Sequence, residues 1–210
     1  MPDSFTRFDD ALSGPLVARS RLLLLALVVP LGLSLMAPLW NLRFEAPQYP
    51  AGLELEIYAY TVEGDVNEIN TLNHYIGMQR IDRAALSELD WLPFGLGVLA
   101  LLCLRVALIG SLRSLVDLTV LFLYFSAYSF ARFVYKLYVF GHDLDPKAAI
   151  TVEPFMPVIL GSKQIANFFT TSLPGAGSLW MGLFGVGLVV ALAWNVAAAL
   201  RERRGASEPA

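Results

Sequence analysis

WLPFGLGVLALLCLRVALIG, residues 91–110, is the stretch of sequence that decides the fold class. Its one charged side chain is Arg105, and about 20 residues of helix are enough to cross the roughly 30 Å hydrocarbon core of a bilayer. The whole chain has the same character, because 56% of its 210 residues are hydrophobic and only 16% are charged. That leaves too little polar surface to cover a soluble globule of this size. The sequence therefore predicts a membrane protein.

Three further apolar runs are long enough to cross a bilayer, which predicts a mainly α membrane protein with four transmembrane helices. Asp117, Arg132 and Lys136 lie in the third run but near its ends, where long side chains can reach the interface. The segments between the spans are expected to form a small α+β cap on one side of the membrane. The predicted spans are 21–40, 91–110, 115–140 and 180–200, the cap segments are 41–90 and 141–179, and the remaining pieces are tails at 1–20 and 201–210 and a turn at 111–114.

The charges beside the spans predict their orientation. Arg19, Arg113 and Arg201 flank the spans on one side, and basic residues near span ends favour the cytoplasm. The cap segments hold more acidic than basic residues. We therefore expect a multi-pass protein of the bacterial inner membrane, with both termini cytoplasmic and the cap in the periplasm. A cleaved signal peptide is the less favoured interpretation of 21–40, because the exit SLMAPLW lacks a small-x-small cleavage site.

The first cap segment carries a strand pattern followed by a helix pattern. Residues 53–60 alternate between apolar and polar side chains, which is typical of a strand with one buried face. Asp65 and Glu68 have the spacing of a capping box, and Gly77 is a natural helix stop, so a helix is predicted over 65–76. Its apolar face would hold Val66, Ile69, Leu72 and Ile76, and its polar face Asn67, Asn70, Thr71 and His74.

The second cap segment carries two helix-start signals. Asp145 precedes Pro146, an arrangement that favours a helix beginning there, with Asp145 as its cap. Ser162 would likewise cap a short helix over KQIANFF, whose apolar residues suit the membrane surface.

Histidine and methionine in the cap are candidate copper ligands. Thioether sulfur is a soft ligand that selects Cu(I), and imidazole binds both oxidation states of copper. Every methionine except Met1 lies in the cap segments or at the outer ends of spans. The alternative remains that these methionines fill gaps in the packing and that the histidines meet water. The candidate ligands are His74, His142, Met78 and Met156.

A stripe of side chains every four residues follows the third span. Tyr124, Tyr128, Arg132 and Lys136 could seat an anion, a quinone head group or a carboxylate, or could form an aromatic belt with bases that reach the interface. No GxSxG, Walker, dinucleotide-binding or HExxH motif is present, and Cys103 is the single cysteine. We therefore do not expect an enzyme.

Four motifs taken together resemble a known family. APQYP (46–50), LNHYIGM (72–78), GHDLDPKAAI (141–150) and GSKQIANF (161–168) are similar to small four-span bacterial inner-membrane proteins encoded beside nitrous oxide reductase maturation genes. The resemblance covers about 20–195. It implies a role near a periplasmic copper enzyme, and no activity of the family is established. The matching residues are Pro47, Tyr49, Pro50, Asn73, His74, Tyr75, Gly77, Met78, His142, Asp145, Pro146, Gly161, Ser162, Lys163 and Gln164.

The leading hypothesis is an accessory protein that holds copper between the two cap segments, or otherwise assists assembly of a periplasmic copper enzyme such as nitrous oxide reductase. The alternatives are a metal-free membrane anchor or docking subunit of a larger complex, and a quinol-linked electron-transfer component that uses Tyr128 and Arg132. The expected partners are the lipid bilayer and a periplasmic copper enzyme or copper chaperone, and no nucleic acid is expected.

Overall fold

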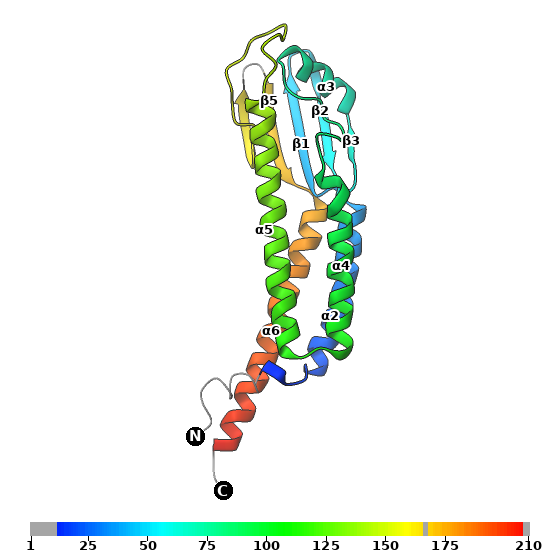
Figure 1. Cartoon of the computed structure of the whole chain (residues 1–210), viewed down its shortest axis with the longest axis vertical. Helices are drawn as coiled ribbons and strands as arrows, with labels where there is room; N and C mark the ends of the chain where they lie inside the picture. Colours follow the sequence, from blue (N-terminus) through cyan, green and yellow to red (C-terminus); the bar gives the residue numbers. More distant parts are fainter. Residues whose placement is uncertain (1–11, 166–167, 208–210) are drawn as a thin grey trace. The chain divides into compact units, whose positions relative to one another are not determined.

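The computed structural model describes residues 12–165 and 168–207, and within them it contains long helices and an antiparallel sheet (Figure 1). The long helices are α2 (Ala18–Met36), α4 (Glu88–Ile109), α5 (Leu112–His142) and α6 (Ala176–Ser207). The short helix α3 is Val66–Tyr75. The strands are β1 (Trp40–Ala46), β2 (Tyr49–Ile57), β3 (Val62–Gly64), β4 (Gly161–Ile165) and β5 (Phe168–Pro174).

Each of the four long helices contains a stretch apolar enough to cross a membrane. This confirms the prediction of four candidate spans, with bounds that differ by a few residues from the predicted runs. The first span is predicted to reach Trp40 but is shorter. Helix α2 ends at Met36, because the chain then turns into strand β1, of which Trp40 is the first residue.

The chain divides into two compact units. The bundle unit comprises the described residues up to Gly32, Leu96–Ser126 and those from Trp180 onward. The sheet unit comprises Leu33–Gly95 and Ala127–Leu179. All four long helices contribute residues to both units.

A buried polar cluster joins α2 to α6 inside the bundle unit. The Asn195 Nδ2 donates to Ser20 Oγ and to the Ala191 carbonyl, both at 2.7 Å, and Asn195 Oδ1 accepts from the Val17 amide at 2.9 Å. Both side chains are buried. A polar group in an apolar helix bundle is costly unless it is hydrogen-bonded, and this asparagine uses both ends of its amide.

The sheet has five strands in the order β3-β2-β1-β5-β4, and every neighbouring pair is antiparallel. Strands β1, β2 and β3 come from the first cap segment, and β4 and β5 come from the second. In Figure 1 the cyan and blue strands of the first segment therefore lie in the same sheet as the gold strand β5. The two cap segments form one folded part, as the sequence predicted.

One face of the sheet builds the core of the sheet unit. Leu42 of β1 and Leu53 and Leu55 of β2 are buried with Ile69 of α3. The intervening residues of each strand face away, so the alternation predicted over 53–60 is confirmed as far as Ile57, where β2 ends. Trp40 closes one end of this core, where its Nε1 donates to Ser172 Oγ at 2.7 Å and its ring lies 4.8 Å from that of Phe133 of α5.

The helix predicted over 65–76 is confirmed as α3, but its start differs in detail. Asp65 makes no side-chain capping bond. Its Oδ2 instead accepts from the Glu54 amide at 2.8 Å, which ties the helix start to strand β2. Ile69 is buried, and Val66 and Leu72 pack beside it, as the apolar face predicted.

Two helix predictions in the second cap segment are wrong. The chain after Asp145 forms turns, and the Asp145 Oδ1 accepts from the Lys147 amide at 2.9 Å without starting a helix. The sequence around Ser162 forms the hairpin of β4 and β5, because Ser162 pairs with Thr171 and the hairpin adds to the edge of β1. Pairing with a distant strand overrides the local helix signal.

Candidate functional site

The candidate site is the place where the motifs LNHYIGM and GHDLDPKAAI meet. The Asp145 amide donates to the Gly77 carbonyl at 2.8 Å, and the Ile150 amide donates to the Tyr75 carbonyl at 2.9 Å. A side-chain bond adds to them, from Gln79 Nε2 to Asp143 Oδ2 at 2.5 Å. The two segments are therefore joined by main-chain and side-chain hydrogen bonds in one region of the sheet unit, which we call the motif junction (residues 73–79 and 141–150).

Gly77 makes this close approach possible. The chain leaves α3 at Gly77 with φ of 77°, a conformation that side chains with a Cβ rarely adopt. A Cβ built at this position would lie 2.7 Å from the Asp145 carbonyl oxygen and 2.9 Å from its nitrogen. Both atoms belong to the backbone and cannot rotate away. The glycine is thus required by the backbone conformation and by the contact with the second segment.

The two histidines each contact a tyrosine. His74 is exposed on α3, as predicted, and its ring centroid lies 6.4 Å from that of Tyr75. His142 is the last residue of α5, and its ring stacks on Tyr138 with centroids 3.9 Å apart. The His142 Nδ1 lies 2.9 Å from the Tyr138 carbonyl oxygen. Because that oxygen can only accept, Nδ1 is the donor in this bond.

The structure places the candidate copper ligands as follows. Met78 lines a cavity in the sheet unit, and Met156 is half-buried. Within the described residues no contact joins the two histidine rings, and no group of three or more His, Cys, Asp or Glu side chains could hold a metal ion. A copper site built from histidine and methionine stays a prediction.

The other predicted site residues are distributed over the sheet unit. Asn73 is buried at 8% exposure, and its Nδ2 donates to the Gln79 carbonyl at 3.3 Å, so it holds the chain that follows α3. Asp145 organises the turn described above. Tyr49 packs against the core from β2, and Lys163 and Gln164 lie exposed on β4.

The stripe on α5 contacts the start of α4 and the chain before it. Arg132 donates to Glu88 Oε1 from Nε at 2.8 Å and from Nη2 at 2.6 Å. Lys136, one turn later, donates to the Ala85 carbonyl at 2.5 Å. The Tyr128 ring lies 5.4 Å from that of Trp91. One of the ligands predicted for this stripe, a carboxylate, is present, and it is the side chain of Glu88 in the same chain.

Glu88 was missed in the sequence. It is the first residue of α4 and only 9% exposed, and its Oε2 has no hydrogen-bond partner among the described residues. A buried carboxylate is costly unless a cation pairs with it, and Arg132 provides that pairing. The signal in the sequence was an acid at the start of an apolar run, which could have been matched to the bases in the next span.

A cavity of about 180 Å³ lies inside the sheet unit and was also not predicted. Its walls come from the inner face of the sheet, from α3, from the last part of α5 and from the chain around 155–158. Asn73, Lys136 and Thr170 are the polar residues that line it, and the other lining side chains are apolar. Periodicity in a sequence shows which residues face inward but not how completely they fill the interior.

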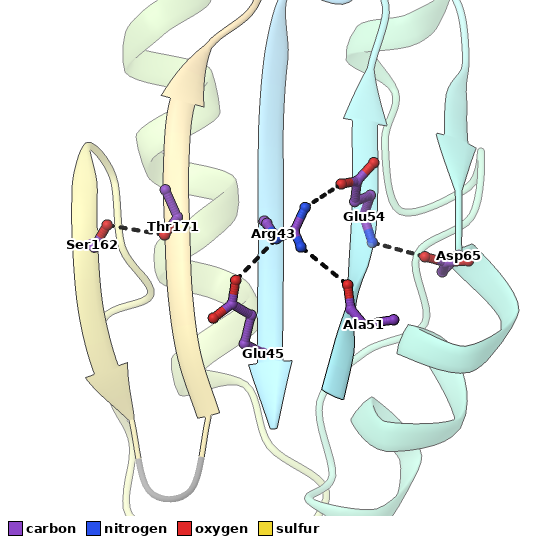
Figure 2. Close-up of polar contacts among 7 residues, drawn as sticks. All are labelled: Arg43, Glu45, Ala51, Glu54, Asp65, Ser162 and Thr171. Carbon is purple, nitrogen blue, oxygen red and sulfur yellow. Dashed lines mark hydrogen bonds and ion pairs between the residues drawn. The ribbon is translucent and has the colours of Figure 1, made fainter. Parts of the chain in front are cut away.

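The opposite face of the sheet is polar (Figure 2). Arg43 is at its centre, with Nη1 2.6 Å from Glu54 Oε1, Nε 3.0 Å from Glu45 Oε1 and Nη2 3.0 Å from the Ala51 carbonyl. Ser162 and Thr171 pair across β4 and β5 at 2.9 Å. All three charged side chains are about half exposed, so this ion-pair network adds little stability and mainly keeps the face soluble.

Comparison of the chain with models of known protein families gave no match, and comparisons with curated proteins and with solved structures gave none either.

Proposed function

We propose that this protein is a multi-pass accessory protein of the bacterial inner membrane that assists assembly of a periplasmic copper enzyme such as nitrous oxide reductase. In this proposal the sheet unit lies in the periplasm and acts as a metal-free docking part. The four ordered motifs, the candidate spans and the basic residues beside them support the setting.

The metal-free role is supported by the contacts that the motif residues make within the chain. Gly77, Asp145 and Asn73 are engaged in the hydrogen bonds and close contacts that build the motif junction. The rings of His74 and His142 lie against tyrosines. The motifs therefore have a sufficient physical role in forming a folded surface, without a metal ion.

Copper handling by His74, His142, Met78 and Met156 is the second candidate, and one observation favours it. A histidine that binds a metal typically donates its other ring N–H to a carboxylate or a carbonyl. His142 has this arrangement, with Nδ1 directed to the Tyr138 carbonyl. The bond from Gln79 to Asp143 also joins the immediate neighbours of Met78 and His142 in the chain.

The deciding experiment compares a strain that lacks this chain with the same strain carrying the wild type or the His74→Ala, His142→Ala double variant. Copper content of the strain's nitrous oxide reductase and of the purified protein is measured in each case. A docking role predicts low enzyme copper without the chain and full recovery with either version. Copper handling predicts that the purified wild type binds copper near-stoichiometrically. It also predicts that the double variant loses this copper and fails to restore the copper content of the enzyme. That result would contradict the docking role.

The control is a double variant of two exposed residues of the same unit, Glu63→Ala with Glu68→Ala. It should recover the enzyme fully under copper handling, because neither carboxylate is among the candidate copper ligands. Full copper loading of the enzyme in the strain without the chain would contradict both proposals.

A further inference from the structure

The cavity in the sheet unit has a wall chemistry that suits hydrocarbon. Leu42 and Leu55 of the sheet, Leu72 of α3 and Phe133 and Phe140 of α5 line its walls. A water molecule needs two to four polar partners to occupy a buried cavity. Of the polar residues at its lining, Asn73 already donates its amide to Gln79. The apolar walls therefore offer water few partners, and an apolar chain would gain contacts along them.

A single cation lies in this wall. Lys136 lines the cavity and donates to the Ala85 carbonyl. An ammonium group has three donors, so this bond leaves two of them. Among the described residues no carboxylate lies within ion-pair distance of Lys136, whereas Arg132 one turn earlier is paired with Glu88. An acidic group on a ligand would be the ionic partner that Lys136 lacks.

The source of such a ligand follows from the helix that forms the wall. Phe133, Lys136, Leu137 and Phe140 all belong to α5, one of the candidate membrane spans. These residues continue the candidate span, so the lipids around that span are the nearest source of a hydrocarbon chain.

We propose that the cavity binds a short segment of one acyl chain of an anionic membrane lipid, with the acidic head group of the lipid at Lys136. This lipid site is separate from the docking role proposed above and does not depend on copper. It gives the sheet unit a way to bind the membrane surface through a specific lipid as well as through the spans.

The test uses the full chain in phosphatidylcholine vesicles that contain a trace of phosphatidylglycerol with a photoreactive diazirine in its acyl chain. After illumination, the labelled peptides are identified by mass spectrometry. Spans are labelled by any bilayer lipid, so the informative peptides are those outside them, around Leu55 of β2 and Leu72 of α3. These are expected to be labelled by phosphatidylglycerol about tenfold more than by phosphatidylcholine with the same diazirine chain, as for one charge-assisted hydrogen bond.

Two pairs of variants complete the test. Leu72→Phe fills the cavity and should abolish labelling around Leu55, while Leu173→Phe, the same change at an exposed position of β5, should leave it unchanged. Lys136→Met should remove the preference for the anionic lipid, and Lys136→Arg should keep it. Labelling confined to the spans, or equal labelling by both lipids in the wild type, would overturn the proposal. That wild-type comparison stands even when Leu72→Phe fails to fold.

Discussion

Gly77 connects a short motif to the fold through the backbone alone. Its carbonyl accepts from Asp145, its φ is positive, and a Cβ would collide with the chain opposite. Gly161 has a similar φ of 89°, but a Cβ there would meet nothing within 4 Å. The two glycines therefore separate the cost of backbone conformation from the cost of the contact between the two cap segments.

Gly77→Ala should destabilise the sheet unit by about 2–4 kcal/mol, because the strained φ costs about 1–2 kcal/mol and the displaced segment adds to it. Gly161→Ala should reduce the stability only by the cost of the strained φ. Thermal unfolding of both variants in the same detergent gives the difference. Equal losses would show that the close contact with Asp145 contributes nothing.

Arg132 and Glu88 allow a second test at the level of single residues. Arg132→Met leaves the buried Glu88 carboxylate without its cation and should destabilise the protein clearly. Adding Glu88→Gln removes the buried charge and should recover much of that loss. Arg83→Met is the matched control, because Arg83 pairs with Asp90 at the same 2.6 Å but both side chains are mostly exposed. It should change the unfolding temperature little, and an equal loss in both arginine variants would contradict this account.

At the scale of elements, the sequence was informative where periodicity is long or unambiguous. The four apolar runs, the alternation of β2 and the apolar face of α3 each depend on local pattern, and each is confirmed. The hairpin of β4 and β5 was predicted as a helix, because a short apolar run fits both periods. Its pairing with β1, more than a hundred residues away in the chain, decides the outcome.

The prediction of a helix after Asp145 is wrong for a related reason. An aspartate followed by proline is a good helix start in isolation, and the Asp145 side chain does accept an amide bond from Lys147. The backbone of the same stretch, however, is bonded to Tyr75 and Gly77. Those bonds hold the backbone in a conformation that is not helical.

The candidate site was predictable only in part at this scale. The sequence predicted that the two cap segments meet, and the motif junction confirms it. It did not predict that both histidines would lie against tyrosines four or fewer residues away, since local ring contacts leave no periodic signal. The cavity depends on packing across the sheet, α3 and α5, which no single segment encodes.

At the scale of the whole molecule, the division into two units predicts which part of the chain a mutation destabilises. Leu55→Ala removes a buried side chain beside the cavity and should cost about 2–4 kcal/mol. We expect faster amide hydrogen exchange in β1, β2 and β5, with little change around Ser20 and Asn195 of the bundle unit. Asn195→Ala should have the reverse pattern. Mass spectrometry after exchange in nanodiscs measures both, and faster exchange throughout the chain in either variant would show that the two units unfold together.

Helix α5 has 31 residues, which corresponds to about 46 Å at 1.5 Å per residue, whereas about 20 residues suffice for a span. Its last turns supply Phe133, Leu137 and Phe140 to the interior of the sheet unit. A water-soluble fragment made by linking 41–90 directly to 141–179 would lack these side chains and expose the inner face of β1 and β2 to solvent. Such a fragment should aggregate on expression, and one that retains residues 127–142 is the better starting point for solution work.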